Sequence, residues 1–243
     1  MLDFLRQFFQ SDSDNEGTWR LDQCLACHKV LQEGMVFPED QVSFCIECFH
    51  STLCFCCGLP CGPLHRRLTD DRIICQYCYD TALLTPRQLA PVYETTLHFF
   101  RRKLKFKLKE QPRLKVVDSR FMQSELGASL HTWGVYSDMG SEETIYVITG
   151  IALDKAHATL AHELTHFWQK RHCPPEQTLE LIEGFAEWVA FQLAQYKNLR
   201  RAMLAIRRNE AEPYQTGLQK MFKLEAKRGV KGAIKYAKTA KSF

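Results

Sequence analysis

The sequence predicts an α+β protein in which a small cysteine-rich region precedes a mainly helical region with a small β-sheet. Three observations support this prediction. Ten of the eleven cysteines lie between Cys24 and Cys78, two β-branched segments occur near the middle of the chain, and helical apolar patterns dominate its C-terminal half. With 243 residues, 45% hydrophobic and 25% charged, the chain is long enough for one or two domains with a real core.

No part of the sequence is typical of a membrane-spanning or secreted protein. Charged residues interrupt every apolar run before it reaches the roughly 18 residues that a spanning helix needs. The first ten residues, MLDFLRQFFQ, contain Asp3 and Arg6 and are not followed by a cleavage site. An odd number of cysteines without a signal peptide indicates metal-bound thiolates rather than disulfides. We therefore expect a cytoplasmic protein with no membrane partner.

Most cysteines form two copies of one pattern, a pair of CxxC motifs separated by seventeen residues. The first copy contains Cys24, Cys27, Cys45 and Cys48, and the second contains Cys54, Cys57, Cys75 and Cys78. Because Zn²⁺ binds four thiolates tetrahedrally, each copy should hold one structural zinc. An alternative set of His50, Cys54, Cys57 and Cys61 has less regular gaps, so the symmetric sets are favoured. The modules could also dock a regulatory partner.

Composition divides the chain into three segments. The acidic run SDSDNEG predicts a flexible leader over residues 1–18, and the two cysteine modules follow at 19–82. Residues 83–243 form the helical region, in which 201–243 carry 11 Lys or Arg against three Glu. A basic segment of this kind could bind an anionic partner, although a solvated helix face is the commoner reason for such a bias.

Local patterns in residues 83–243 predict both strands and helices. β-branched and aromatic residues indicate strands at 115–117 and 144–151. If the second strand lies at a sheet edge, its free backbone groups could pair with an extended peptide, whereas an interior strand could not. Helices are expected over 92–104, 154–169 and 179–199 and after Pro213, with interruptions at Gly217, Gly229 and Gly232.

The pentapeptide HELTH is an HExxH motif formed by His162, Glu163 and His166. On a helix, residues four apart lie one turn above each other, so both imidazoles can face one ion while Glu163 reaches its bound water. Composition alone would produce such a pentapeptide in about 2% of comparable chains, so its context must support it. The alternative is a pair of half-buried histidines on an amphipathic helix.

A catalytic zinc needs a third protein ligand and an open position for water, and Glu183 is the candidate ligand. It follows His166 by 17 positions, and the intervening Pro-Pro turn can make the two helices antiparallel. Glu187 lies one turn further on and could support His162 by accepting its free ring N–H. Either glutamate alone could be an ordinary solvated residue, but HExxH and ExxxE together favour a metal site.

HELTH followed by EGFAE resembles the gluzincin metallopeptidases, in which a glutamate on the second helix is the third zinc ligand. The tandem cysteine modules resemble a LIM domain, although five residues rather than two separate them and Cys45 stands where a His is common. Together they resemble the DA-one-like, ubiquitin-activated peptidases in a short bacterial-type version. The resemblance implies a LIM-like domain before a gluzincin domain, with zinc held by His162, His166 and Glu183, Glu163 as base and Glu187 as support.

We therefore predict a zinc metallopeptidase that cleaves peptide bonds of protein substrates. Zinc-activated water would attack the carbonyl, and Glu163 would act as general base and then as general acid. Tyr214 is a candidate for stabilising the oxyanion, because gluzincin relatives often use a downstream tyrosine or histidine; an ordinary packed tyrosine is the alternative. His131 and Tyr136 are weaker candidates for this role.

The competing hypotheses are a non-catalytic zinc-module adaptor and a nucleic-acid-binding protein. The second would use the basic C-terminal segment together with the cationic run at 101–109, but the sequence has no recognition-helix pattern, so nucleic acid is not the expected partner. The number of zinc ions separates the hypotheses. A peptidase should hold three, one catalytic and two structural, whereas a binding module should hold two.

Overall fold

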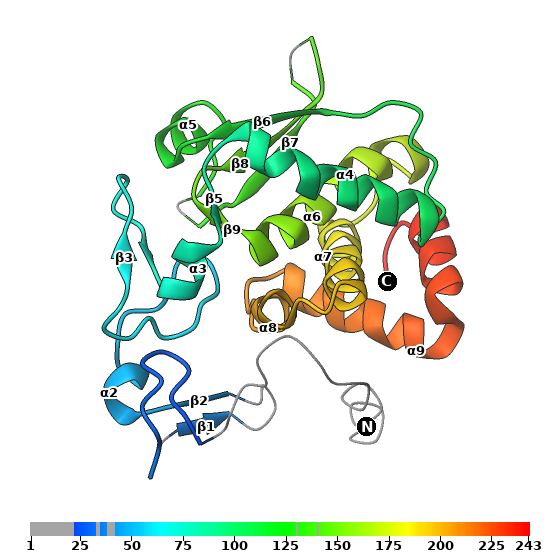
Figure 1. The fold of residues 1–243 in the computed structure, drawn as a ribbon. Coiled ribbons are helices and arrows are strands. Elements are labelled where there is room, and N and C mark those ends of the chain that lie inside the picture. Colours follow the sequence, from blue (N-terminus) through cyan, green and yellow to red (C-terminus); the bar gives the residue numbers. More distant parts are fainter. Residues whose placement is uncertain (1–21, 33–34, 38–41, 130, 140) are drawn as a thin grey trace.

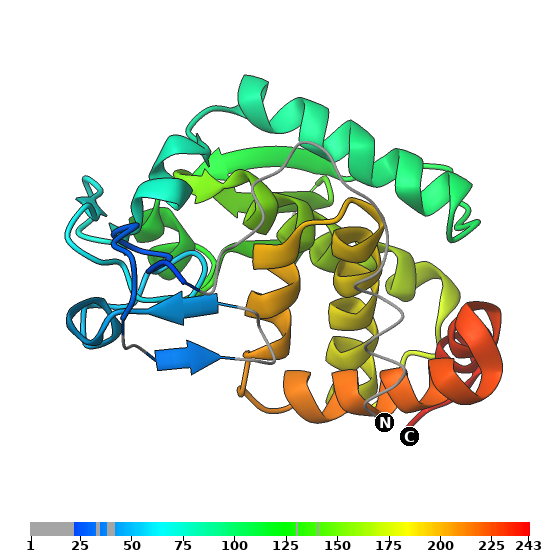
Figure 2. The ribbon, with the colours of Figure 1, turned by 60° about the horizontal axis from the view of Figure 1, so that its bottom comes forward.

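The computed structural model describes residues 22–32, 35–37, 42–129, 131–139 and 141–243, and the predicted leader at 1–18 lies outside this range. The chain is a mixed α/β protein with small sheets and a cysteine-rich N-terminal region (Figure 1). The cysteine-rich region lies at one side of the molecule. Most of the remainder is made up of the long helices α4 (Pro86–Arg102), α6 (Leu153–His172), α7 (Leu179–Tyr196) and α9 (Tyr214–Thr239). Figure 2 shows β1 (Met35–Phe37) and β2 (Val42–Phe44) on that side and α9 at the far end.

The two cysteine modules repeat one local structure. A short antiparallel hairpin precedes a short helix whose N-cap is a cysteine, Cys45 in the first module and Cys75 in the second. In both, the residue after the first CxxC pair, His28 or Gly58, has a positive φ. The hairpins and helices are β1 (Met35–Phe37), β2 (Val42–Phe44) and α2 (Ile46–Phe49), then β3 (Arg66–Arg67), β4 (Ile73–Ile74) and α3 (Gln76–Asp80). The internal duplication in the sequence is therefore also a duplication of structure.

The second module is joined to the helical region by a two-stranded sheet. Strand β5 (Ala82–Leu83) pairs antiparallel with β9 (Ile151–Ala152), which leads directly into α6. The Tyr77 hydroxyl of α3 donates to Asp154 Oδ2 at 2.9 Å, and Arg72 donates to the Thr149 carbonyl at 2.6 Å. The start of the HExxH helix thus rests on the second cysteine module.

The main sheet has the order β6-β8-β7, with β6 (Arg113–Val117) parallel and β7 (Gly134–Ser137) antiparallel to β8 (Thr144–Ile148). The predicted strand at 144–151 is therefore an interior strand that ends at Ile148, and it cannot offer a free edge to a peptide. A tight turn at Gly150, with φ of 74°, separates it from β9. The outer strand β7 was missed from the sequence because its four residues, GVYS, are too short for a pattern.

In the described residues five longer helices enclose the core, and their boundaries differ from those predicted. The first begins six residues earlier than expected, because Thr85 and Gln88 form a capping box and Pro86 suits the first turn. The helix expected over 179–199 ends at Tyr196, and a separate helix begins at Arg200, because Asn198 between them has a positive φ. Of the three glycines, Gly229 alone has non-helical backbone angles. The helices are α4 (Pro86–Arg102), α6 (Leu153–His172), α7 (Leu179–Tyr196), α8 (Arg200–Arg207) and α9 (Tyr214–Thr239), with the short α5 (Ser119–Ser124) beside the sheet.

The hydrophobic core lies where α6 and α7 pack together against α4, α9 and the sheet. Its largest fully buried side chains include Phe100, Phe167, Phe185 and Trp188. Burying aromatic side chains of this size contributes roughly 1.5–3 kcal/mol each. In the part of the chain that the structure describes, each helix is too short or too polar to cross a bilayer.

Candidate metal centre

The eight predicted cysteine ligands gather into two clusters of four. The Sγ atoms within each cluster lie within 4.8 Å of one another, and both clusters have the symmetric composition that the spacing predicted. The Cys27 and Cys45 sulfurs are 3.8 Å apart, and those of Cys57 and Cys75 are 3.9 Å apart. A tetrahedral zinc with Zn–S bonds of about 2.3 Å requires sulfur separations of about 3.8 Å, so both clusters fit zinc.

The alternative second set does not form. His50 is exposed and its ring lies edge-on against Phe49. Cys61 is buried beside the second cluster, as is Cys56, whose thiol is directed at the Gly150 carbonyl at 3.9 Å. Neither belongs to the four sulfurs that converge. Cys173, at the end of α6, is half-buried, and burial raises the pKa of its thiol to about 11.

Three further candidate ligands meet between α6 and α7. His162 Nε2 lies 3.0 Å from His166 Nε2 and 3.2 Å from Glu183 Oε2, and the His166 nitrogen lies 3.4 Å from the same oxygen. These atoms lie within 4.8 Å of one another and could hold a metal ion. The helical spacing of four residues brings the two imidazoles to one face, and antiparallel packing of α7 brings the carboxylate.

The remaining ring nitrogens determine how the imidazoles are protonated. His162 Nδ1 is 3.0 Å from Glu187 Oε2, and His166 Nδ1 is 3.0 Å from Gln169 Oε1. The Gln169 amide nitrogen donates to the Ile182 carbonyl at 2.9 Å, which directs its oxygen at His166. Both Nδ1 atoms therefore donate, so when the imidazoles are neutral, as metal binding requires, both Nε2 lone pairs point at the same place. Two lone pairs and a carboxylate that converge in this way suit a cation.

The short distances between these groups determine the pKa values of His162, Glu183 and Glu187. Burial lowers the pKa of His162, but the Glu183 and Glu187 carboxylates outweigh it and raise the pKa above its usual value. Burial raises the pKa of Glu183 and of Glu187, but the His162 imidazole outweighs it in both, and the two pKa values fall below the usual range. The carboxylates therefore remain ionised at neutral pH and can neutralise a bound divalent cation.

Glu163 is directed to the strand that covers its helix. Its Oε2 atom accepts a hydrogen bond from the Tyr136 backbone N–H of β7 at 2.8 Å. A Cβ added to Gly134 would lie 2.5 Å from the Thr159 methyl and 3.0 Å from Glu163 Cγ, so only glycine allows β7 this close to α6. The candidate base thus has one oxygen engaged, and a carboxylate retains further acceptor sites.

Tyr214 lies beside His162, at the first position of α9. Its ring centroid is 5.9 Å from that of His162, and burial, with the nearby carboxylates, raises the pKa of its phenol to about 12. The position depends on a close helix crossing, because a Cβ added to Gly184 would lie 2.4 Å from the Gly217 backbone. The two other aromatic candidates point elsewhere. His131 stacks on Phe55, and the Tyr136 hydroxyl donates to Glu143.

Sequence reasoning overlooked two groups that contact the predicted residues. Gln169 could have been found, because it lies three residues after His166 on the same helical face. The Tyr136 N–H could not, because a backbone donor has no signature in side-chain pattern. A scan of protein-family models, a search of curated proteins and a search of solved structures each return no match to this chain.

Proposed function

We propose that this protein is a zinc-dependent endopeptidase that hydrolyses peptide bonds in protein substrates. One observation carries the proposal, the convergence of His162 Nε2, His166 Nε2 and Glu183 Oε2 beside the Glu163 carboxylate. Three protein ligands with a carboxylate base next to them are typical of catalytic rather than structural zinc. The two cysteine clusters, with four ligands each, would be structural and closed to substrate.

A zinc ion at this site would supply Lewis acidity and lower the pKa of its bound water towards about 7. Side chains of the protein would transfer the proton and orient the ligands. Glu163 would take the proton from the attacking water on its carboxylate and deliver it to the leaving amine nitrogen. Glu187 and Gln169 would hold the two imidazoles in the tautomer that leaves Nε2 free.

Tyr214 is the proposed donor to the developing oxyanion. Its ring lies beside His162, and its raised pKa keeps the phenol protonated, so its O–H can donate. We further propose a cytoplasmic location and a protein partner as substrate, because a zinc–thiolate protein suits a reducing compartment. The resemblance to ubiquitin-activated peptidases suggests that an activator could be needed, and the assay should include one arm with ubiquitin.

The first test is metal content. Purified protein analysed for zinc against protein concentration should contain three ions per chain, and two in the double variant His162→Ala/His166→Ala. The adaptor and the nucleic-acid hypotheses both predict two ions in the wild type. A wild type with two ions would therefore remove the main support for the proposal.

The second test is proteolysis. Wild type and Glu163→Gln are incubated with the same protein mixture, and new termini are identified by mass spectrometry. Wild type should generate termini that Glu163→Gln does not, while both variants retain three zinc ions. New termini at equal rates in both samples would refute Glu163 as the base.

A further inference from the structure

The hydrogen bond from Tyr136 to Glu163 connects the proposed base to the outer strand of the sheet. β7 pairs with β8 through alternate residues, since the Trp133 carbonyl accepts from Ile148 N at 2.9 Å. Gly134 and Tyr136 therefore direct their backbone groups away from the sheet, towards α6. The Tyr136 N–H uses this direction to reach Glu163 Oε2. Any shift of β7 along α6 would therefore move the backbone N–H that donates to Glu163.

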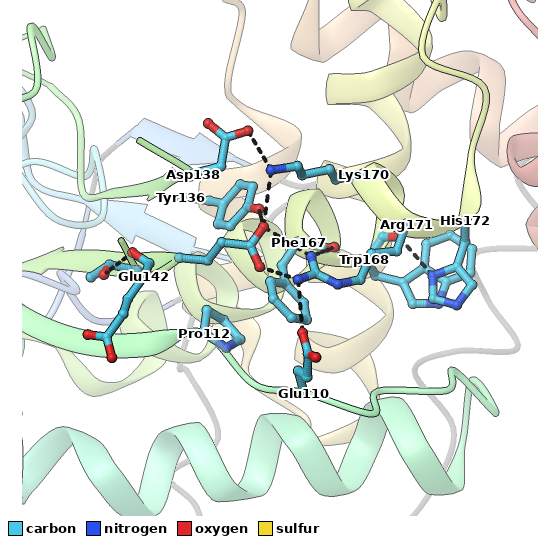
Figure 3. A network of polar contacts seen from close by, with 12 residues as sticks. Glu110, Pro112, Tyr136, Asp138, Glu142, Phe167, Trp168, Lys170, Arg171 and His172 are labelled. Carbon is cyan, nitrogen blue, oxygen red and sulfur yellow. Dashed lines mark hydrogen bonds and ion pairs between the residues drawn. The ribbon is translucent and has the colours of Figure 1, made fainter. Parts of the chain in front are cut away.

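Four charged residues and one tyrosine fix β7 on α6. We name this group the Glu143 cluster, and it consists of Tyr136, Asp138, Glu143, Lys170 and Arg171 (Figure 3). Glu143 accepts from the Tyr136 hydroxyl and forms ion pairs with Arg171 and with Lys170, the latter at 3.2 Å. Lys170 also meets Asp138 at 2.8 Å. The cluster thus joins the residues on both sides of the β7–β8 connection to the last turn of α6.

The cluster is more enclosed than an ordinary surface ion pair. The side chains of Glu143 and Arg171 retain 22% and 29% exposure, and the Arg171 guanidinium lies 3.7 Å above the Phe167 ring. Phe167 in turn meets the Tyr136 ring edge-on. Exposed pairs of this kind commonly contribute little, whereas an enclosed network with several hydrogen bonds can fix a geometry. The cluster can therefore fix the position of β7 relative to α6.

We propose that Glu143 is a positioning residue for the reaction: through Tyr136 it holds the backbone N–H of β7 against the Glu163 carboxylate and so fixes the orientation of the general base. This inference rests on the proposed function. The Tyr136 hydroxyl and backbone N–H belong to one residue, so one end of Tyr136 is anchored by Glu143 while the other orients Glu163. Misplacement of a catalytic group by a fraction of an ångström lowers the rate of the chemical step more than it weakens substrate binding.

Charge within the cluster supports this role. The Arg171 guanidinium lowers the pKa of Glu143 to about 2, so the carboxylate is ionised at neutral pH. Burial, with the hydrogen bond to Glu143, raises the pKa of Tyr136 to about 12, so the phenol remains a donor. Glu143→Gln keeps the shape of the side chain and one acceptor oxygen, but it removes the negative charge that pairs with both cations and strengthens the hydrogen bond from the phenol.

The activity arm of the test compares Glu143→Gln with Glu110→Gln. Glu110 is the matched control, because it also pairs with Arg171, at 3.5 Å, but its side chain is 78% exposed. On a peptide substrate identified by the protein screen, Glu143→Gln should lower kcat about tenfold with KM within about twofold, and Glu110→Gln should change neither. In a Glu163→Asp background, whose shorter side chain withdraws from Tyr136, Glu143→Gln should lower kcat less than about twofold.

The second part of the test, hydrogen exchange, does not depend on peptidase activity. Amide hydrogen exchange of the zinc-loaded protein should be at least tenfold faster for residues 134–137 in Glu143→Gln than in wild type, and unchanged in Glu110→Gln. Residues 157–168 of α6 serve as the internal control for folding. Should Glu143→Gln lose α6 protection as well, Tyr136→Phe, which removes only the phenol arm, replaces it and should accelerate the same strand.

The outcomes separate the two proposals. The wild type could cleave no substrate while Glu143→Gln still accelerates exchange in β7. This result would refute the peptidase function but would support the contact by which Glu143 positions β7. A peptidase whose kcat and strand exchange are both unaffected by Glu143→Gln would retain the function and overturn the positioning role. An equal loss of kcat in the wild-type and Glu163→Asp backgrounds would also overturn it, because Glu143 would then act by another route.

Discussion

Gln169 Oε1 lies 3.0 Å from Nδ1 of His166, three residues earlier on α6, and mirrors the contact that Glu187 makes with His162. The two histidines are therefore oriented by different means, one by a neutral amide and the other by a carboxylate. The amide is itself held by the Ile182 carbonyl on α7. Both ring orientations thus depend on the packing of α6 against α7.

Removing this support should weaken zinc binding at the histidine site. Gln169→Leu keeps the size of the side chain but leaves the His166 Nδ1–H without its acceptor, so we expect about 10- to 100-fold weaker binding. Gln169→Glu retains an acceptor and should bind within a few-fold of wild type. Competition with a chelator of known affinity measures the third zinc. Equal affinity in wild type and Gln169→Leu would show that the contact has no supporting role.

Tyr214 should affect the rate without affecting the metal. Tyr214→Phe keeps the ring beside His162 but removes the proposed oxyanion donor, so we expect kcat to fall roughly 100-fold with three zinc ions retained. Steady-state kinetics on an identified substrate, together with elemental analysis, tests both statements. A kcat within twofold of wild type would assign Tyr214 to packing alone.

The crossing of α7 and α9 should tolerate no side chain at Gly217. A Cβ there would lie 2.3 Å from the Glu180 carbonyl and 2.6 Å from Gly184 Cα, so Gly217→Ala must separate the helices. Overpacking of this kind costs about 1–3 kcal/mol, and separation would also displace Glu183 and Tyr214. Gln219→Ala, at an exposed position of the same helix, is the control. Urea unfolding measures the loss, and a fully stable Gly217→Ala would contradict the observed contact.

The two cysteine modules should differ in their effect on the histidine site. Cys75→Ser removes a ligand from the second module, whose β5 pairs with β9 at the start of α6. We expect it to lower the zinc content by more than one ion and to weaken the protection of α6. Cys45→Ser is the matched change in the first module and should remove one ion only. Elemental analysis and hydrogen exchange distinguish the two variants. Identical losses of zinc and of α6 protection would show that the pairing of β5 with β9 does not couple the second module to the histidine site.

Acid should destabilise the protein through Glu143. Its pKa falls to about 2, chiefly because of Arg171, from a value near 4.5 in the unfolded chain, so its contribution is complete above pH 4.5 and is lost as the pH falls towards 2. The shift corresponds to about 3 kcal/mol. Urea unfolding of wild type and Glu143→Gln at pH 6 and pH 3 should give a difference between the two proteins that shrinks with acid. A difference independent of pH would contradict the pairing.

The sequence by itself determined the ligands that lie close together along the chain. CxxC pairs and an HExxH helix place their donor atoms by local geometry, so spacing alone predicted which four cysteines would gather and that His162 and His166 would face one point. The apolar pattern predicted the ends of the helices less well. Thr85 begins a helix by capping it, and Asn198 lies where the chain leaves a helix with a positive φ, and neither effect depends on the spacing of apolar residues.

Only the tertiary structure decided which strands lie at the edges of the sheet, where the second module is attached and how Glu163 is held. The Tyr136 N–H and Glu163 are 27 residues apart, and Arg171 and Glu143 are 28 apart. Such contacts arise from the packing of a sheet on a helix, which depends on the whole core and on backbone groups that every residue shares. A repeating pattern in the sequence records the face that a side chain occupies, but not the distant group that it meets there.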